Sequence, residues 1–168
     1  MKHRGVLLDY TIKIGGEAGQ GIQTIGDTLS RVFSRSGYYV FSHQDYESRV
    51  RGGHNFYQIR LSDKQVSASR KKIDILVALD KESIIRHQNE LSDDGIIVYD
   101  SSSIKEKFTA PSFLDIPFTE LALQNGGDKI MSNTVATGAV LGMLGISIKP
   151  LHDILGNELK KKGDEILK

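Results

Sequence analysis

The stretch YTIKIGGEAGQGIQTIG, residues 10–26, decides the fold of this 168-residue chain. Residues 10–14 alternate in polarity as a strand does, and a glycine-rich segment follows at residues 15–21. Apolar side chains then recur at helical spacing from residue 22 to residue 33, and Gly37 is expected to end that helix. With a second strand expected at residues 38–41, the chain opens as a strand–glycine loop–helix–strand unit, which is typical of α/β folds.

The rest of the chain continues this pattern. Two apolar stretches are typical of strands covered on both faces, a weaker strand precedes three helices, and two segments around Ser62-Asp63-Lys64 are expected to form a hairpin. In chain order, the expected elements are the hairpin strands 55–61 and 65–69, the strands 73–79, 95–99 and 113–116, and the helices 117–124, 134–144 and 151–162. We therefore predict one Rossmann-like domain over residues 1–168: an open, mostly parallel, mixed sheet with helices on both faces.

Several residues mark the ends of these elements. Asp80 is expected to cap a helix that contains Ile84 and Ile85, and Asp93-Asp94-Gly95 is expected to turn into the strand 95–99. Ser132 or Asn133 is expected to cap the helix 134–144, where Gly138 and Gly142 would allow close packing against a neighbour.

Composition excludes several classes of protein. The formal net charge of +1 argues against a dedicated nucleic-acid binder. The absence of cysteine excludes disulfides, thiolate-held iron–sulfur clusters and a cysteine nucleophile in this chain. The first residues lack the apolar core of a signal peptide, and the longest mostly apolar run, residues 135–146, is too short to cross a membrane. A cytoplasmic protein without a membrane or nucleic-acid partner is expected.

The glycine-rich segment GGEAGQG has three interpretations. Backbone N–H groups between a strand and a helix can bind an anion, although Ile22-Gln23 replaces the Lys-Ser/Thr of a P-loop and Glu17 would repel a phosphate. A dinucleotide fingerprint would put Thr24 at its third glycine and Asp45 near the ribose. A tight turn without a ligand and a protein interface remain open beside anion binding.

A second unusual stretch, HQDYESRVRGGH, covers residues 43–54. We expect residues 42–54 to form a loop at the carboxyl end of a strand, where ligands sit in open α/β sheets. Arg49 and Arg51 would hold phosphate or carboxylate oxygens, and Tyr46 beside them would suit a protein contact. A metal site of His43, Asp45 and His54 is a less favoured alternative, so we interpret the stretch as a binding loop.

Three stretches together resemble a known family. IGGEAGQGI (14–22), DYESRVRGGHNFYQIRLSD (45–63) and SNTVATGAVLGMLGI (132–146) are similar to the gamma-type domain of 2-oxoacid:ferredoxin oxidoreductases, and the resemblance runs over nearly the whole chain. Such enzymes decarboxylate a 2-oxoacid on thiamine diphosphate, pass electrons through iron–sulfur clusters to ferredoxin, and transfer the acyl group to coenzyme A. The gamma-type domain carries neither the thiamine core nor the clusters, and is associated with covering the active site and admitting coenzyme A.

The resemblance implies that this chain supports a reaction of the 2-oxoglutarate or pyruvate class and is inactive alone. It implies no catalytic residue, no metal ligand and no cofactor held by this chain by itself. The complex would use thiamine diphosphate, Mg²⁺, iron–sulfur clusters and coenzyme A. Its partners would be thiamine-binding alpha- and beta-type subunits or domains, with ferredoxin reached through the complex. Whether the chain is a free subunit or an N-terminal module of a fused chain stays open.

The resemblance also singles out two sets of residues and Asn133, for which it implies a secondary role at the rim of the active site, in contact with substrate or partner. The first set matches the family's glycine loop and implies contact with an anion or a partner: Gly15, Gly16, Gly19, Gln20 and Gly21. The second matches its arginine–glycine loop and implies contact with substrate or partner: Ser48, Arg49, Arg51, Gly52, Gly53 and His54. Within the second set, Arg51 is the preferred charged contact. Two other hypotheses remain, a stand-alone Rossmann-like nucleotide-binding protein and a ligand-free assembly module.

Overall fold

The structure is a computed structural model that describes residues 8–46, 53–126 and 128–166. Six strands form one sheet in the order β2-β3-β1-β4-β5-β6. The strands are β1 (Asp9–Glu17), β2 (Tyr39–Tyr46), β3 (His54–Ser62), β4 (Ile73–Ala78), β5 (Leu91–Tyr99) and β6 (Phe113–Asp115). The α-helices are α1 (Ile22–Arg35), α2 (Lys81–His87), α3 (Ser101–Ile104), α4 (Phe118–Gly126), α5 (Ser132–Met143) and α6 (Lys149–Ile166), and the 3₁₀ helices are η1 (Gln88–Glu90) and η2 (Lys129–Met131).

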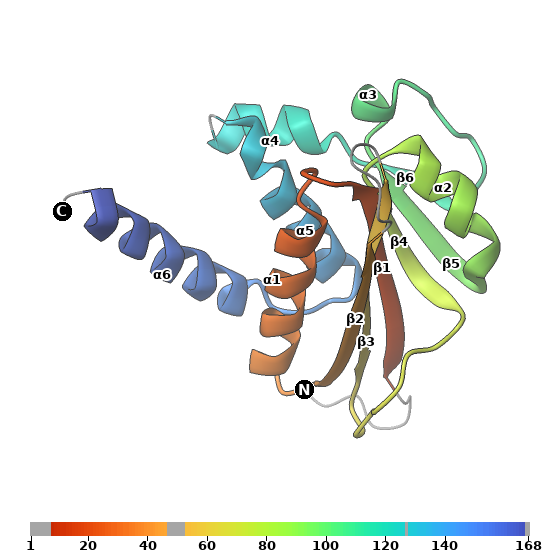
Figure 1. The fold of residues 1–168 in the computed structure, drawn as a ribbon, viewed down its shortest axis with the longest axis horizontal. Helices are drawn as coiled ribbons and strands as arrows, with labels where there is room; N and C mark the ends of the chain where they lie inside the picture. The colour runs from red at the N-terminus through yellow and green to blue at the C-terminus, as the bar shows by residue number, and fades with distance from the viewer. Residues whose placement is uncertain (1–7, 47–52, 127, 167–168) are drawn as a thin grey trace.

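The sheet is mixed and mostly parallel. β1, β4, β5 and β6 are parallel to one another, whereas β3 is antiparallel to both β1 and β2. Figure 1 shows α1, α5 and α6 on one side of the sheet and α2 and α3 on the other. The predicted α/β class, with helices on both faces of a mostly parallel mixed sheet, is confirmed.

The main core lies between α1 and the centre of the sheet. Ile25, Leu29 and Phe33 of α1 are fully buried against the side chains of Ile12 and Ile14 on β1, together with residues of β3, β4 and α5. Each such side chain stabilises the fold by about 1.5–3 kcal/mol when it leaves water. This packing fixes the direction in which α1 leaves the glycine loop.

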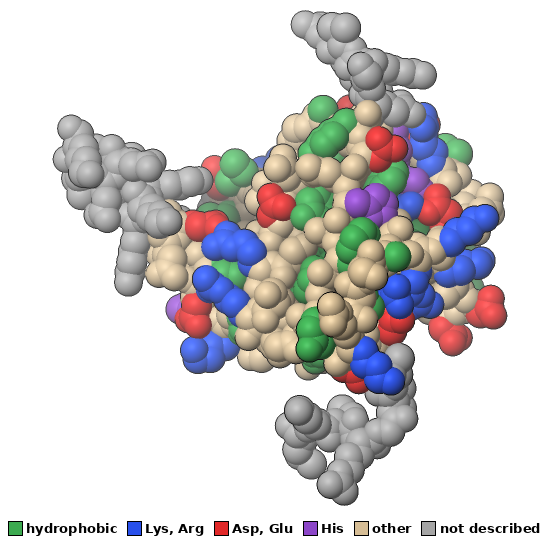
Figure 2. Space-filling model, turned by 60° about the horizontal axis from the view of Figure 1, so that its bottom comes forward, with side chains coloured by type: hydrophobic (Ala, Val, Ile, Leu, Met, Phe, Trp, Pro, Cys, Tyr) green, Lys and Arg blue, Asp and Glu red, His purple; other side chains and the backbone are tan. Residues whose placement is uncertain are grey.

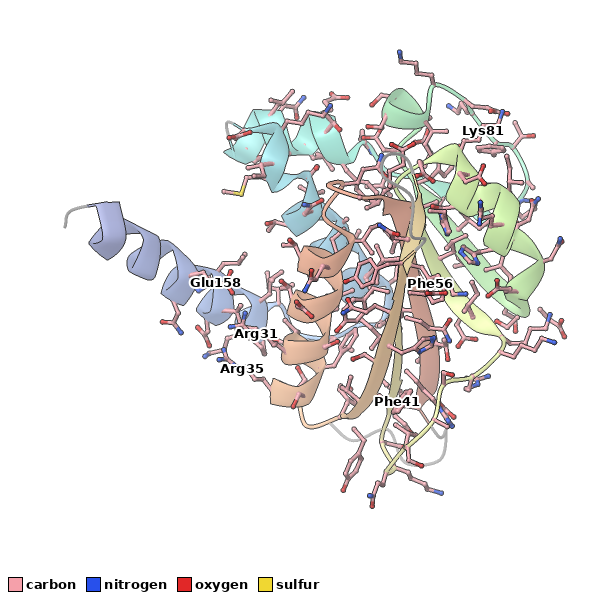
Figure 3. The ribbon with its side chains drawn as sticks, in the orientation of Figure 1. Arg31, Arg35, Phe41, Phe56, Lys81 and Glu158 are labelled. Atoms are coloured by element: carbon pink, nitrogen blue, oxygen red, sulfur yellow. The ribbon has the colours of Figure 1, made fainter. Side chains whose placement is uncertain are left out.

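A surface ion pair joins α6 to this core layer. Arg31 of α1 reaches Glu158 of α6 at 2.5 Å, and both side chains come from neighbouring helices (Figure 3). On the face shown in Figure 2, basic, acidic and apolar side chains are interspersed, in keeping with the small net charge. None of the helices within the described ranges is long and apolar enough to span a membrane.

The hairpin predicted around Ser62-Asp63-Lys64 is wrong. β3 ends at Ser62, and residues 65–69 form no strand. The physical reason is that both edges of β3 are already paired, one with β1 and the other with β2. The true hairpin is β2–β3, and β2 extends to Tyr46, into the stretch that we expected to be a loop.

β5 also differs from its prediction at one end. It begins at Leu91, so Asp93-Asp94-Gly95 lies inside the strand and is not a turn. At Gly95 an added Cβ would lie 3.0 Å from the backbone oxygen of Ile73, on the neighbouring strand β4. The pairing of β4 with β5 shifts register between Ile73 and Ile75, so the start of β5 is irregular where this polar segment lies.

The start of α2 agrees with prediction, whereas the start of α5 does not. The Asp80 carboxylate accepts the Ser83 N–H at 2.8 Å and caps α2. α5 begins at Ser132 with Met131 in the capping position and no side-chain cap, so the predicted cap is wrong. Gly138 and Gly142 have open space where a Cβ would be, so the expected close packing at these glycines is also wrong.

We predict that Gly26→Ala lowers the free energy of unfolding by about 1–3 kcal/mol, because the added methyl overpacks the core. An added Cβ on this residue of α1 would lie 2.4 Å from the buried Tyr57 ring of β3. Gly138→Ala in α5 is the matched control, since it meets open space and gains up to about 1 kcal/mol in helix propensity. Urea denaturation of both variants tests this, and equal stabilities would contradict the packing described.

Candidate functional site

One edge of the sheet gathers both sequence motifs. β1, β4, β5 and β6 are parallel and end there, and β2 ends there too because it is parallel to β1 across the reversed strand β3. β3 starts at the same edge, where Glu17 pairs with His54 and Gly16 pairs with Asn55. The glycine loop after β1 and the residues Gly53 and His54 before and in β3 are therefore neighbours, at the edge where open α/β sheets bind ligands.

The glycine loop is shorter than predicted, because β1 continues through Gly15 and Gly16 to Glu17. These two glycines are required by close contacts. A Cβ on Gly15 would lie 2.7 Å from Ser83 Oγ, and one on Gly16 would lie 2.5 Å from Gln20 Oε1. The loop itself then consists of residues 18–21.

Two side chains hold this loop in place. The Gln20 side-chain oxygen accepts the Glu17 N–H at 2.7 Å and closes the loop on itself. Gly19 and Gly21 have φ angles of 91° and 89°, a region that favours glycine. The Asn133 amide of α5 lies against Gly21, since a Cβ there would be 2.0 Å from its nitrogen. Asn133 therefore contacts the glycine loop but does not cap α5, and the site role assigned to it stays a prediction.

The arginine–glycine motif is only partly described. Gly53 and His54 are buried, and the His54 Nε2 atom is 2.7 Å from His87 Nε2 of α2, so this ring points into the molecule. Ser48, Arg49, Arg51 and Gly52 lie outside the described residues, and the roles assigned to them stay predictions.

A cleft of about 630 Å³ opens between the ends of β1 and β4. The chain leaves β1 toward β2 on one side and leaves β4 toward β5 on the other, so this is the point where the winding of the sheet reverses. The lining combines the glycine loop, the ends of β4 and β5, and the start of α5: Gly19, Gln20, Ala78, Leu79, Asp100, Ser102, Ser103, Lys105, Phe118, Thr119, Lys129, Ile130, Ser132 and Asn133.

The two lysines of this cleft, Lys105 and Lys129, were missed by the sequence analysis. Lys105 follows α3 with a positive φ of 60°, and Lys129 belongs to η2 before α5. Lys105 follows the predicted strand 95–99, which was its signal in the sequence, whereas Lys129 follows a predicted helix and had no such signal. Two ammonium groups beside several hydroxyls make the cleft suited to an anionic ligand.

Asp100 holds one wall of the cleft together. It accepts hydrogen bonds from the N–H and hydroxyl groups of Ser102 and Ser103 and from the Thr119 N–H, at 2.5–3.3 Å. Burial is the largest influence on the pKa of Asp100 and raises it, but these hydrogen bonds together outweigh burial and bring the pKa below its ordinary value. Because both of its carboxylate oxygens accept these hydrogen bonds, Asp100 has a structural role and connects the end of β5 to α3 and α4.

A smaller groove of about 360 Å³ adjoins the start of α1, with Thr24, Gln44, Tyr46 and Asn55 in its lining. Asp45, considered as a ribose-binding acid, is exposed on β2 and pairs in register with Phe56. Across residues 8–46, 53–126 and 128–166, no three His, Asp or Glu side chains are grouped as metal ligands. Within these residues, His43, Asp45 and His54 do not form the alternative metal site.

Residues 11–168 match the model of the pyruvate ferredoxin/flavodoxin oxidoreductase family. The chain belongs to this family. A 2-oxoacid:ferredoxin oxidoreductase subunit alpha from Sulfolobus sp. is 32% identical over 64% of this chain and 17% of the relative. The 2-oxoglutarate synthase subunit KorC of Archaeoglobus fulgidus is 26% identical over 94% of this chain and 83% of its own length. The chain thus spans less than a fifth of the alpha subunit but most of KorC.

Solved structures of the family share the fold. The 2-oxoglutarate:ferredoxin oxidoreductase from Magnetococcus marinus, solved with 2-oxoglutarate, coenzyme A and succinyl-CoA bound, superimposes with a TM-score of 0.81 and 25% identity. The match covers 95% of this chain and 28% of that one. The gamma subunit of a keto/oxoacid ferredoxin oxidoreductase from Geobacter sulfurreducens PCA gives a TM-score of 0.70 at 24% identity over 84% of this chain and 81% of that subunit, which supports the fold.

We predict that Gly21→Ala destabilises the fold more than Gly19→Ala. Both variants lose about 1 kcal/mol or more for a side chain at positive φ, but only the Cβ at position 21 collides with Asn133. The additional loss should be about 1–3 kcal/mol. A double-mutant cycle with Asn133→Ala should recover that additional part, and the absence of coupling in urea denaturation would contradict the contact.

Proposed function

We propose that this chain is the gamma-type component of a 2-oxoacid:ferredoxin oxidoreductase. The observation that carries the proposal is the extent of the match: nearly the whole chain aligns with KorC, and 95% of it superimposes on part of the Magnetococcus marinus enzyme. The reaction is the thiamine diphosphate-dependent oxidative decarboxylation of a 2-oxoacid, of the 2-oxoglutarate or pyruvate class, to acyl-CoA with ferredoxin as acceptor. The relatives are named as subunits, so the activity belongs to an assembly.

The partners in this proposal are thiamine-binding alpha- and beta-type subunits or domains. They supply the thiamine diphosphate, the Mg²⁺ and the iron–sulfur clusters. This chain contains no cysteine, so it has no thiolate with which to hold an iron–sulfur cluster. The single domain formed by residues 1–168 contributes its carboxyl edge, where the glycine loop and the start of β3 meet. We propose that the chain works in the cytoplasm together with these partners.

The cleft between β1 and β4 is the part of this edge that we assign to coenzyme A. Its volume of about 630 Å³ lies within the range of small-molecule sites, roughly 300–1,000 Å³. Lys105 and Lys129 face the cleft and carry the positive charge that the coenzyme's phosphates require. The negative charge of Asp100 does not cancel this attraction entirely, because that carboxylate is already surrounded by hydrogen-bond donors.

The first test is reconstitution of this chain with thiamine-binding alpha- and beta-type subunits. We expect 2-oxoacid-dependent reduction of ferredoxin only when the tagged chain is present and co-purifies with them. If the chain co-purifies with these subunits but no ferredoxin is reduced, the result would support the alternative of a ligand-free assembly module. A monomer that binds NAD or ATP tightly and no partner would instead support the nucleotide-binding alternative, which the glycine loop and the cleft would also suit.

The role of the cleft is tested in the reconstituted complex with Lys105→Gln/Lys129→Gln. Losing two ammonium–phosphate contacts should raise KM for coenzyme A by about tenfold or more, since each charged contact contributes on the order of 1 kcal/mol or more. Lys149→Gln is the control, because that lysine is exposed on α6 and pairs with Asp153. Normal turnover with an unchanged KM for coenzyme A would remove the cleft from the proposal while leaving the family role intact.

The motif residue Arg51 is tested separately. If it contacts substrate, coenzyme A phosphate or a partner carboxylate, Arg51→Ala should lower turnover or complex formation by about tenfold or more, as expected for a lost charged hydrogen bond. Arg35→Ala, at the far end of α1, is a charge-matched control. Unchanged assembly and turnover in Arg51→Ala would show that this arginine has no such role.

A further inference from the structure

The two lateral edges of the sheet are built differently. β6, at one edge, has only three residues, whereas β2, at the other, has eight. All eight residues of β2 pair with β3 in one continuous register. Proteins usually protect a sheet edge from other chains with short strands, bulges, prolines or lysines. β6 is protected by its length, but β2, with the sequence YVFSHQDY, has none of these four features.

The outer side of β2 carries backbone groups that can bind another strand. In an antiparallel pair, alternate residues direct their N–H and C=O groups toward the partner strand and away from it. Across residues 8–46, 53–126 and 128–166, β2 pairs with β3 alone, and no backbone group outside that pair bonds to it. A row of alternating donors and acceptors of this kind is recognised by a polypeptide in extended conformation.

Aromatic side chains lie along this edge on the face of the sheet that carries α2. The ring centroids of Phe41 and His43 on β2 are 6.4 Å apart, and both residues are half-buried. His43 makes a T-shaped contact with Phe56 of β3, and Figure 3 labels Phe41 and Phe56. The contact of Phe56 with His87 of α2 identifies the face. Every second side chain of an added strand would lie on this face, where apolar groups would pack against the rings.

Two carboxylates flank the edge, one on each face of the sheet. Asp45 of β2 is exposed on the aromatic face, since side chains alternate along a strand. Asp27 of α1 lies on the opposite face, where it accepts a hydrogen bond from Tyr57 Oη at 3.0 Å. Tyr57 Oη is also 3.3 Å from Ser42 Oγ, so Asp27 lies beside the middle of β2.

The basic side chains of the neighbouring elements leave this negative charge unbalanced. Figure 3 shows Arg31 and Arg35 on the side of α1 that faces α6. Within the described part of the chain, neither Asp27 nor Asp45 has a cationic partner, so the edge attracts a positively charged strand. Three basic side chains of β1, β3 and α1 are paired with other acids: Lys13 with Glu90, Arg60 with Asp9, and Arg31 with Glu158.

A second copy of this chain fits the edge less well than a basic segment does. Antiparallel pairing of two β2 strands over their whole length is centred at Ser42 and His43. Because Asp27 lies beside Ser42, the two Asp27 carboxylates would come together near the two-fold axis and repel each other. A strand with two basic side chains three positions apart would instead reach both carboxylates, since such side chains lie on opposite faces and Asp45 is three positions from Ser42.

We propose that the outer edge of β2 is a docking site for an extended, basic segment of a thiamine-binding partner subunit, which adds one strand to the six-stranded sheet. The backbone hydrogen bonds of the added strand supply affinity, and its basic and apolar side chains select the segment. The partner is the one named in the proposed function, on which the docking site therefore depends.

Hydrogen exchange of the β2 amides tests the docking site, measured by mass spectrometry in the free chain and in the complex with thiamine-binding alpha- and beta-type subunits. In the free chain, about half of the amides of residues 39–46 should exchange rapidly, because they point outward without a hydrogen bond. In the complex, exchange of these amides should slow by about tenfold or more, since the added strand must first separate. Exchange of residues 75–78 in the central strand β4 is the control and should be slow in both samples.

The possible results separate this docking site from the proposed function. Unchanged exchange at β2 in a complex that forms would overturn the docking site and leave the proposed function intact. Absence of any complex would overturn both. Slowing that grows with the concentration of the chain alone would identify a second copy as the occupant and overturn the assignment to a partner subunit.

Charge reversal at the edge tests the chemistry assigned to the partner segment. Asp45→Lys should weaken binding of the alpha- and beta-type subunits by about tenfold or more in isothermal titration, because like charges would then face each other. Asp94→Lys is the matched control, since it changes the net charge equally at an exposed position of β5, and its affinity should equal that of the unaltered chain. Equal affinities of the two variants would overturn the basic segment. Should Asp45→Lys fail to fold, Asp45→Asn should show a smaller loss in the same direction.

Discussion

The antiparallel pairing of β3 with β1 is the constraint on which the rest of the structure depends. Its register places His54 opposite Glu17, so the start of the second motif meets the end of the first. A slip of one residue would turn Ile59 and Leu61 out of the core and reverse every side chain of β3. The burial of these side chains therefore fixes both the core and the composition of the carboxyl edge.

Local signals in the sequence were sufficient for most helices and strands but not for which strands pair. The alternation in β1, the helical spacing in α1 and the Asp80 cap each depend on neighbouring residues, and the structure confirms them. The choice of strand pairing is non-local, so residues 65–69 were wrongly given a place beside β3. The cleft lysines and the Lys13–Glu90 ion pair were not predicted for the same reason. Each depends on contacts with residues that are far away in the sequence.

The walls of the cleft are preformed by polar contacts within the chain. On one side Asp100 joins the end of β5 to α3 and α4. On the other, Gln20 closes the glycine loop and Asn133 lies against Gly21. Rigid walls reduce the ordering cost of binding. The family resemblance located the glycine loop and Asn133, whereas Asp100 and Lys105 became visible only once the strands had been placed in their order in the sheet.

The central position of β1 has a consequence for how the chain folds. Its two neighbours are β3 and β4, which are synthesised later, and the second of them ends at Ala78. During synthesis, β1 therefore lacks its first neighbour until Ser62 has left the ribosome and its second until Ala78 has done so, and its apolar side chains Ile12 and Ile14 are exposed over that interval. Strand pairings between residues far apart in the sequence make folding slow. Binding of a chaperone during translation would therefore matter most over that interval.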